Sequence, residues 1–366
     1  MRVLYDYQAF GAQRAGGVSR YFVELLREWR RGGAVSPELI APLSVNCHLA
    51  EARAELGVLV HSLQMPAAWR PEPALALANR VLFAAATFGR AWDLYHPTYY
   101  NALWPAPRAR RLVVTVFDMT HERFPDLFPT HDPTAARKRL AIQAAHGIVC
   151  ISEATRHDLV EITGVAVEKT TVIPLATRIG EAAAAAFSHP RPFWLFVGAR
   201  GGYKNFDMLI EALAGAPALN ETDAVCFGGG ALTEVERRLL AAHGLTTRVR
   251  WVTGDDALLR GAYEHALALV YPSRYEGFGL PPLEAMTLGC PVVATTGSSL
   301  PEVVKEGGVM IPPDDVLALA DTLVSLAHNS AERSCLVTAG LQQAARFSWT
   351  NCAAQTAAFY RKVLTC

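Results

Sequence analysis

Short apolar runs alternate with helix-like stretches along most of the chain. Runs that are apolar throughout and separated by helices are typical of parallel strands covered on both faces. The pattern therefore predicts two doubly wound α/β domains in series. The runs of the first half are RVLYDY, DLYHP, RLVVTVFD, GIVCIS and TTVIP, and those of the second half are WLFVG, AVCFGG, VRWVT, ALVYPS and PVVAT.

The domain boundary is predicted between Pro174 and Pro190, where TTVIP ends and a low-information EAAAAAF stretch precedes WLFVG. This gives domains over 1–175 and 176–345. The remaining segment, 346–366, is amphipathic and is predicted to be a helix that crosses back over the first domain. Ligands of such sheets bind at the carboxyl ends of the strands, so we expect the chemistry in the loops that follow strands.

The composition of the 366 residues excludes several protein classes. Lys+Arg and Asp+Glu balance at 34 each, whereas a nucleic-acid-binding protein is normally strongly basic. The start MRVLYDYQAF lacks the apolar region of a signal peptide, and no run of about 18 apolar residues occurs, so we expect a cytoplasmic protein. The seven cysteines are scattered without a CxxC pair, which supports neither a disulfide framework nor a zinc site.

The segment EGFGLPPLEAM places two carboxylates around a glycine turn. Glu276 precedes the turn, while Pro281 and Pro282 mark a helix start that puts Glu284 in the first helical turn. A helix N-terminus favours nearby negative groups. Taken singly, Glu284 could merely offset the helix dipole and Glu276 could be a solvated loop residue.

With its glycines, double proline and preceding strand, this segment resembles the E-x7-E signature of retaining GT-B glycosyltransferases, family 4 in particular. The resemblance implies a GT-B fold, with a cleft between two Rossmann-like domains, the first on the acceptor side and the second binding a nucleotide sugar. It implies that Glu284 holds the ribose hydroxyls. It also implies that Glu276 faces the donor sugar and its phosphate, together with the backbone amides of Gly277, Phe278, Gly279 and Leu280.

A second resemblance covers FVGARGGYKNFDMLIEAL. In the family, an Arg and a Lys after this strand neutralise the donor diphosphate, and Arg200 and Lys204 are assigned to those places. The glycines of CFGGG are a weak signal for a turn that lines a nucleotide. Gly254 and Asp255 are candidates to border the base.

In the first domain, Gly16 and Gly17 open a helix; in the family this loop lies near the donor phosphate and the acceptor, and a plain tight turn is the alternative. The aromatic loop HPTYYNALWP follows the strand DLY. Its residues are candidate acceptor contacts because aromatic rings stack on sugars, and ordinary core packing is the alternative. The residues concerned are His96, Tyr99, Tyr100 and Trp104.

The segment VVTVFDMTHERFP departs from the family. Many relatives carry a His before the Asp at this strand end, but here Phe117 precedes Asp118. Asp118 and His121 are both candidates for the residue near the reacting carbon, with His121 taking over the missing contact. A lone His is otherwise commonly a structural residue.

The resemblance implies a retaining transferase that needs no metal or other cofactor, the nucleotide sugar being a co-substrate. The motifs look like those of bacterial mannosyltransferases of surface polysaccharide synthesis, lipopolysaccharide included, which predicts GDP-mannose as donor and a saccharide or lipid-linked saccharide as acceptor. Residues 1–175 carry 19 Lys+Arg against 16 Asp+Glu, an excess that would suit peripheral contact with the inner membrane. The alternatives are a catalytically silent nucleotide-sugar-binding subunit, or another GT-B enzyme such as an epimerase or a phosphorylase.

Overall fold

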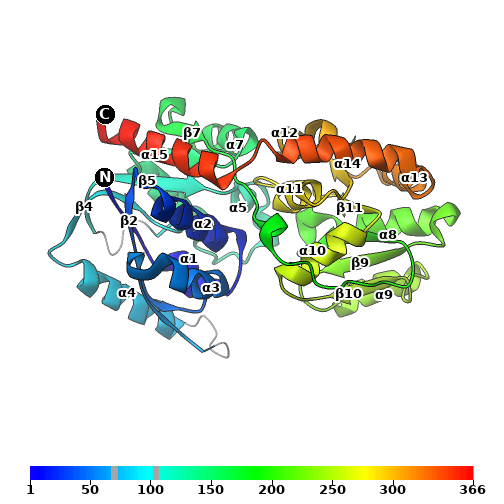
Figure 1. Cartoon of the computed structure of the whole chain (residues 1–366), viewed down its shortest axis with the longest axis horizontal. Helices are drawn as coiled ribbons and strands as arrows, with labels where there is room; N and C mark the ends of the chain where they lie inside the picture. Colours follow the sequence, from blue (N-terminus) through cyan, green and yellow to red (C-terminus); the bar gives the residue numbers. More distant parts are fainter. Residues whose placement is uncertain (67–72, 102–106, 366) are drawn as a thin grey trace. The chain divides into compact units, whose positions relative to one another are not determined.

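A computed structural model describes residues 1–66, 73–101 and 107–365; Trp104 lies outside this range. The chain forms two compact units, each described here by itself (Figure 1). Unit 1 comprises Met1–Leu175 and Trp349–Cys366, and unit 2 comprises Ala176–Ser348. Within the described residues, no helix combines the length and the apolar character needed to cross a membrane.

Unit 1 contains a seven-stranded sheet whose pairings are all parallel, in the order β3-β2-β1-β4-β5-β6-β7. Its strands are β1 (Arg2–Tyr5), β2 (Ser36–Ser44), β3 (Val60–Gln64), β4 (Ala91–His96), β5 (Arg108–Val116), β6 (Gly147–Cys150) and β7 (Thr170–Val172). Its helices are α1 (Gln8–Ala12), α2 (Gly17–Arg31), α3 (Cys47–Leu56), α4 (Pro73–Thr87), α5 (Thr120–Arg123), α6 (Thr134–Ala144), α7 (Glu153–Thr163) and α15 (Trp349–Thr365).

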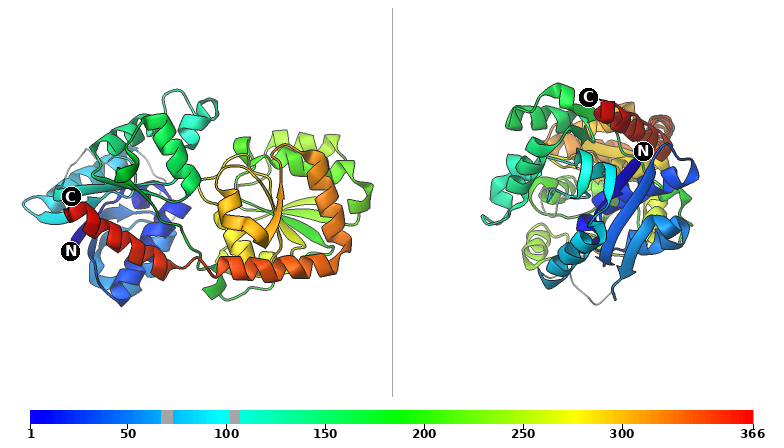
Figure 2. Two further views of the ribbon diagram at one scale, coloured as in Figure 1. Left: turned by 90° about the horizontal axis from the view of Figure 1, so that it is seen from above. Right: turned by 90° about the vertical axis from the view of Figure 1, so that its left-hand side faces the viewer.

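Unit 2 contains a six-stranded parallel sheet in the order β10-β9-β8-β11-β12-β13, with helices on both faces (Figure 2). Its strands are β8 (Phe193–Val197), β9 (Asp223–Phe227), β10 (Val249–Val252), β11 (Ala268–Tyr271), β12 (Val292–Thr295) and β13 (Gly308–Ile311). Its helices are α8 (Phe206–Gly215), α9 (Glu234–Ala242), α10 (Asp256–His265), α11 (Leu280–Thr287), α12 (Leu300–Val304), α13 (Val316–His328) and α14 (Ser330–Ala344).

The predicted class, two Rossmann-like α/β units with parallel sheets, is confirmed. All ten predicted strands are present, and β2, β3 and β13 are additional. In each unit the strand order reverses direction beside the first strand of the unit, so that β1 pairs with β4 and β8 pairs with β11. Ligands of doubly wound sheets bind outside the carboxyl ends of the strands at this switch point.

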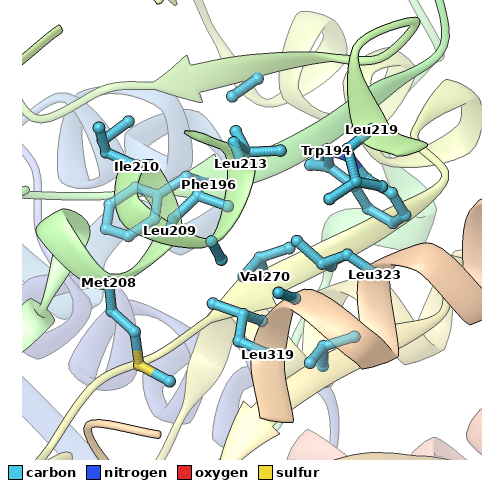
Figure 3. Close-up of a cluster of buried hydrophobic side chains, with 14 of the residues drawn as sticks. Trp194, Phe196, Met208, Leu209, Ile210, Leu213, Leu219, Val270, Leu319 and Leu323 are labelled. Atoms are coloured by element: carbon cyan, nitrogen blue, oxygen red, sulfur yellow. The ribbon is translucent and has the colours of Figure 1, made fainter. Parts of the chain in front are cut away.

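The core of unit 2 is a continuous apolar cluster between the sheet and its helices (Figure 3). Trp194 and Val270 from the sheet pack with Leu209 of α8 and Leu323 of α13, and all four side chains are buried. Because β8 and β11 are apolar on both faces, their side chains anchor them in the middle of the sheet. The loops that follow these two strands are therefore held by a rigid frame.

The last helix, α15, packs on unit 1. The Tyr360 hydroxyl lies 2.8 Å from the Tyr5 hydroxyl of β1 and 2.5 Å from His96 Nδ1 at the end of β4. These groups are buried, so each hydrogen bond satisfies a polar atom that water cannot reach. The helix thereby joins the core of the first unit although it is distant in sequence.

Candidate functional site

Lys204 and Glu276 meet at the switch point of unit 2. Lys204 follows β8 and Glu276 follows β11, and these two strands are neighbours in the sheet. Lys204 Nζ lies 2.6 Å from Glu276 Oε1, and the two side chains are only 15 % and 11 % exposed. The sequence motifs predicted both residues, and the strand order brings them into contact across 72 positions of the chain.

Tyr271 completes this charged pair and was missed by the sequence analysis. It is the last residue of β11, and its hydroxyl accepts a hydrogen bond of 3.0 Å from Lys204 Nζ. Burial and the neighbouring Glu276 carboxylate raise the pKa of Tyr271 well above its ordinary value, so the hydroxyl stays neutral. The signal that could have identified Tyr271 from the sequence is its hydroxyl at the carboxyl end of a strand that is otherwise apolar.

Glu284 lies beside the same turn, held by a second buried tyrosine. Tyr263 of α10 donates a hydrogen bond of 3.1 Å to Glu284 Oε2. Burial and the Glu284 carboxylate raise the pKa of Tyr263 well above its ordinary value. Glu284 is the fifth residue of α11, which begins at Leu280, so the prediction of a place in the first turn is wrong by one residue. The two prolines occupy that first turn instead.

The turn before α11 is fixed by glycine and by two serines. Gly279 has φ 108°, and a Cβ atom there would lie 2.9 Å from Leu300 Cδ2. The hydroxyls of Ser298 and Ser299 donate to the Glu276 carbonyl at 2.8 Å each, and Ser299 Oγ also lies 2.9 Å from the Phe278 carbonyl oxygen. Neither proline has an N–H group, so the amide donors at this helix start can come only from the turn up to Leu280.

Arg200 has partners within unit 2 that the sequence did not indicate. Its side chain is 2 % exposed, and its Nε lies 2.8 Å from Glu236 Oε1 at the start of α9. The other guanidinium nitrogens donate to the carbonyls of Gly228, Gly230 and Ala231. Because four of its five N–H groups are engaged inside unit 2, Arg200 stabilises the CFGGG turn. Its contact with a diphosphate stays a prediction, and Lys204 is a second cation near the switch point.

Asp255, a predicted border of the base, caps a helix. Its carboxylate accepts a hydrogen bond of 3.0 Å from the Leu258 amide at the start of α10. Gly254 directly precedes it, after β10. In unit 1, Gly16 is the N-cap of α2 and Gly17 its first residue, as expected of a helix start. The binding roles predicted for these residues stay predictions.

Asp118 and His121 lie after β5, where the sequence predicted them. Asp118 Oδ1 accepts a hydrogen bond of 2.9 Å from the Thr120 amide, and its side chain is 37 % exposed. The His121 ring stacks on Phe128 at 3.8 Å between centroids, with its Nε2 3.8 Å from Asp132 Oδ2. Asp118 thus remains accessible, whereas the His121 ring is largely covered.

Lys138 is a buried cation beside this loop and was also missed. Its side chain is 1 % exposed, and its Nζ donates to the Asp118 carbonyl at 2.9 Å and to Glu122 Oε2 at 2.8 Å. Phe117 stands where many relatives of the resembled family carry a His. Its ring is buried against Tyr21 and Phe22. Phe117 therefore belongs to the core.

Two of the predicted acceptor contacts are core residues. His96 is fully buried, and its Nδ1 and Nε2 are engaged by Tyr360 and Thr115; burial lowers its pKa to about 3. Tyr100 is buried in the cluster between β5 and α6, and its hydroxyl accepts from the Phe117 amide. Neither side chain can reach a sugar without unpacking the unit, so these two predictions are wrong.

Tyr99 is partly buried beside a cavity of unit 1, and its predicted acceptor contact stays a prediction. It lines a cavity of about 600 Å³ at the switch point of unit 1, between the residues after β1 and those after β4. Two arginines, Arg80 and Arg137, line the same cavity. Core packing was the alternative considered for this aromatic loop, and it holds for His96 and Tyr100. Tyr99 packs against the same cluster as Tyr100 but is only partly buried and also lines the cavity.

One group of metal-type ligands occurs among the described residues: His157, Asp158 and Glu161 on α7. Asp158 and Glu161 both pair with the Arg123 guanidinium. A cation would have to displace this arginine, so the group does not fit a metal centre well.

Two known families match this chain. The family "Glycosyltransferase Family 4" matches residues 15–178, and the family "Glycosyl transferases group 1" matches residues 181–343. The first match lies in unit 1 except for its last three residues, 176–178, and the second match lies within unit 2. Together they cover the described strands of both sheets except β1.

Individual relatives agree with these families. The chain is 28% identical over 309 residues to the O-antigen chain mannosyltransferase B of Escherichia coli, covering 80% of this chain and 81% of that protein. Its fold is similar to sucrose-phosphate synthase from Thermosynechococcus elongatus, with TM-score 0.77 and 19% identity over 100% and 99% of the two chains. It is also similar to Anabaena Alr3699/HepE in complex with UDP and glucose, with TM-score 0.75 and 18% identity over 99% and 100%.

Proposed function

Because the chain carries a family 4 glycosyltransferase domain followed by a group 1 domain, we propose that it transfers a hexosyl group from a nucleotide sugar to a saccharide or lipid-linked saccharide with retention of anomeric configuration. The observation that carries the proposal is the contact between Lys204 and Glu276 at the switch point of unit 2. A cation held at the end of a strand can stabilise the negative charge of a leaving diphosphate.

Lys204 stabilises the negative charge that develops as the glycosidic bond to the diphosphate breaks. Glu276 and Tyr271 hold its ammonium group in place before the donor arrives, so little reorganisation is needed during the reaction. Glu276 also offers a carboxylate to the hydroxyls of the donor sugar. Amides of the turn before α11 complete the phosphate contacts, since the N-terminal end of a helix favours an anion.

Glu284 binds the ribose. A carboxylate accepts two hydrogen bonds from a vicinal diol, and Tyr263 fixes its orientation from behind. This contact is made equally in the ground state and the transition state, so it contributes to donor affinity more than to turnover.

Retention without a covalent intermediate is the mechanism we favour. Asp118 is accessible, whereas Glu122 of the same loop is paired with the buried Lys138, and we assign no covalent nucleophile to either of them. The acceptor hydroxyl then attacks on the face that the leaving diphosphate departs from. The diphosphate oxygen takes the proton of the hydroxyl, a new glycosidic bond forms and the bond to the diphosphate breaks.

Mannose from GDP-mannose is the proposed donor group. The support is the mannosyltransferase relative, which the chain matches over most of its length. The complex of HepE with UDP and glucose shares only 18% identity and bears on the fold alone. The same relative, named for O-antigen chains, supports a role in surface polysaccharide synthesis.

Thermal unfolding with GDP, UDP, dTDP and ADP tests the nucleotide site. A ligand that binds only the folded state at 100 times its dissociation constant adds about 2.7 kcal/mol of stability. We expect GDP to raise the unfolding temperature of the wild type, and the Glu284→Gln variant to lose the shift. Glu306→Gln, an exposed glutamate of the same unit, is the matched control. Absence of a shift with all four nucleotides would contradict the proposed site.

A further inference from the structure

The polar groups that line the cavity of unit 1 differ in whether the fold already engages them. This cavity, called here the unit 1 cavity, has a volume of about 600 Å³ and lies beside α1 and α4 (Figure 1). The Asn79 amide uses both of its polar atoms on the backbone of Leu43, at 2.8 and 2.9 Å. The Gln8 amide likewise uses both on the backbone of Asn101, at 2.8 and 3.2 Å. These two side chains therefore build the wall and are not available to a ligand.

A buried carboxylate outside the lining holds the wall in place. Asp6 directly follows β1 and is 1 % exposed. It accepts hydrogen bonds from the Tyr95 hydroxyl at 2.6 Å, the Thr98 amide at 2.9 Å and the Thr98 hydroxyl at 2.7 Å, and it also contacts the Gln8 amide. The segment after β4 that carries Tyr99 is thus tied to the segment after β1. A cavity whose walls are fixed in this way loses little entropy when a ligand binds.

The remaining polar groups of the lining are mostly hydrogen-bond donors. The hydroxyls of Tyr7 and Tyr99 and the guanidinium of Arg137 have no hydrogen-bond partner among the described residues. Burial and nearby carboxylates raise the pKa of each hydroxyl to about 12, so both keep their protons, and an arginine can only donate. Asn101 adds one amide, and Arg80 already interacts with other groups of the chain. No carboxylate of the described residues lines the cavity.

The carboxylates that lie near Tyr99 are largely offset by a buried cation. Asp118, Asp132 and Glu122 contribute to the raised pKa of Tyr99. Lys138 Nζ lies 2.8 Å from Glu122 Oε2 and 3.9 Å from Asp118 Oδ1, so two of these three charges have a counterion within unit 1. The lining itself therefore presents donors and positive charge to a ligand.

We propose that the unit 1 cavity binds an acidic sugar of the acceptor, a ring that carries a carboxylate or a phosphate. The Tyr99 ring packs on the apolar face of the sugar, and the Arg137 guanidinium pairs with the acid group. A neutral sugar offers hydroxyls to the tyrosines but leaves the guanidinium without a counterion. This inference rests on the proposed function, because it names the class of acceptor that the same transferase uses.

Binding without a donor tests the site independently of transfer. Saturation-transfer NMR titrations of the full chain compare methyl α-mannoside, methyl α-mannuronoside and methyl α-mannoside 6-phosphate. We expect an acidic glycoside to bind at least ~10-fold more tightly than the neutral one, since a hydrogen bond to a charged group is stronger than one between neutral groups. A preference for the uronate would identify a carboxylate as the acid group, and a preference for the phosphate ester would identify a phosphate.

Two arginines of α6 provide a matched pair of variants. Arg137→Gln should reduce the ratio of the acidic to the neutral affinity to about one, and Tyr99→Phe should weaken binding of the acidic glycoside about 5-fold. Arg139 lies two residues further along the helix and lines a different cavity with Thr163 of α7, so Arg139→Gln should keep the preference. Both arginines are exposed, so their replacement should leave the fold intact, which urea unfolding verifies.

The outcomes separate this inference from the proposed function. Equal affinity of the wild type for all three glycosides, or an acid preference that Arg137→Gln retains, would overturn the acidic-sugar site. Transfer from nucleotide sugars to the same glycosides is then measured. Tight binding of an acidic glycoside without transfer from any donor would contradict the proposed function alone. Transfer to methyl α-mannoside that is as efficient as transfer to both acidic glycosides would overturn the acidic-sugar site alone.

Discussion

Replacing Lys204 by methionine removes the charge at the switch point while keeping most of the side-chain length. Lys204 is the cation we place on the leaving diphosphate, and its side chain is 15 % exposed, so solvent screens it only partly. Removing one preorganised group of this kind costs about 2.7–4 kcal/mol of transition-state stabilisation, a factor of about 10²–10³ in kcat. We expect K204M to lose that factor, and the exposed Lys169→Met control to keep wild-type activity.

The same variant should also weaken the fold, because Glu276 would be left without its partner. Breaking a buried ion pair by removing one member costs about 3 kcal/mol or more. The double variant K204M/E276Q removes both charges and should regain most of that stability without regaining activity. This contrast separates the chemical role of Lys204 from its structural one.

The loss of kcat and the loss of stability can be measured on the same preparations. Initial rates of nucleotide release over a range of donor concentrations give kcat, and urea unfolding gives the free energy of unfolding. A K204M variant with kcat within a factor of two of the wild type would refute the role of Lys204. A double variant that is less stable than K204M would refute the ion-pair reasoning.

Three further predictions concern single residues. Glu284→Ala should weaken nucleotide binding at least ~10-fold in calorimetry with little loss of stability, since it removes a charged hydrogen-bond acceptor; unchanged affinity would remove Glu284 from the ribose. Arg200→Ala should lower the unfolding temperature by freeing Glu236 and the CFGGG turn; a selective loss of kcat in a fully stable protein would support a direct role for Arg200. His96 binds a proton in the unfolded chain below about pH 6.5 but in the folded chain only near pH 3. The free energy of unfolding should therefore decrease as the pH is lowered from about 6.5 towards 3, and at pH 5 the loss should be about 2 kcal/mol. His96→Gln should flatten that slope of unfolding free energy against pH, and an unchanged slope would contradict the buried neutral ring.

The strands that the sequence predicted are those with uninterrupted apolar runs. The strands it missed lack that signal: β2 reads SPELIAPLS, with two prolines and a glutamate, and β3 and β13 are short and half-exposed. β2 is held in the sheet by its neighbours on both sides and by α4, which are long-range contacts that a local pattern does not contain. The fold class survives these omissions because the order of the remaining elements already defines it.

The candidate site was predictable where a local motif carries a residue and unpredictable where its partners are remote. Lys204 and Glu276 were found because the motifs after β8 and β11 resemble those of the family. The partners of Arg200 were missed because the carboxylate that binds it, Glu236, comes 36 residues later on another helix. His96 looked like a surface loop residue, but α15 covers it through Tyr360, which lies 264 positions away.

The most direct test of the central claim is a transfer assay with a defined product. The purified chain is incubated with GDP-mannose and an alkyl α-mannoside, and proton NMR follows the anomeric signals of the product. We expect GDP release coupled to a new α-linked mannose, since retention preserves the α configuration of the donor. A β-linked product would contradict the retaining mechanism, and the absence of transfer from GDP-mannose, UDP-glucose and the other common nucleotide sugars would contradict the proposed activity.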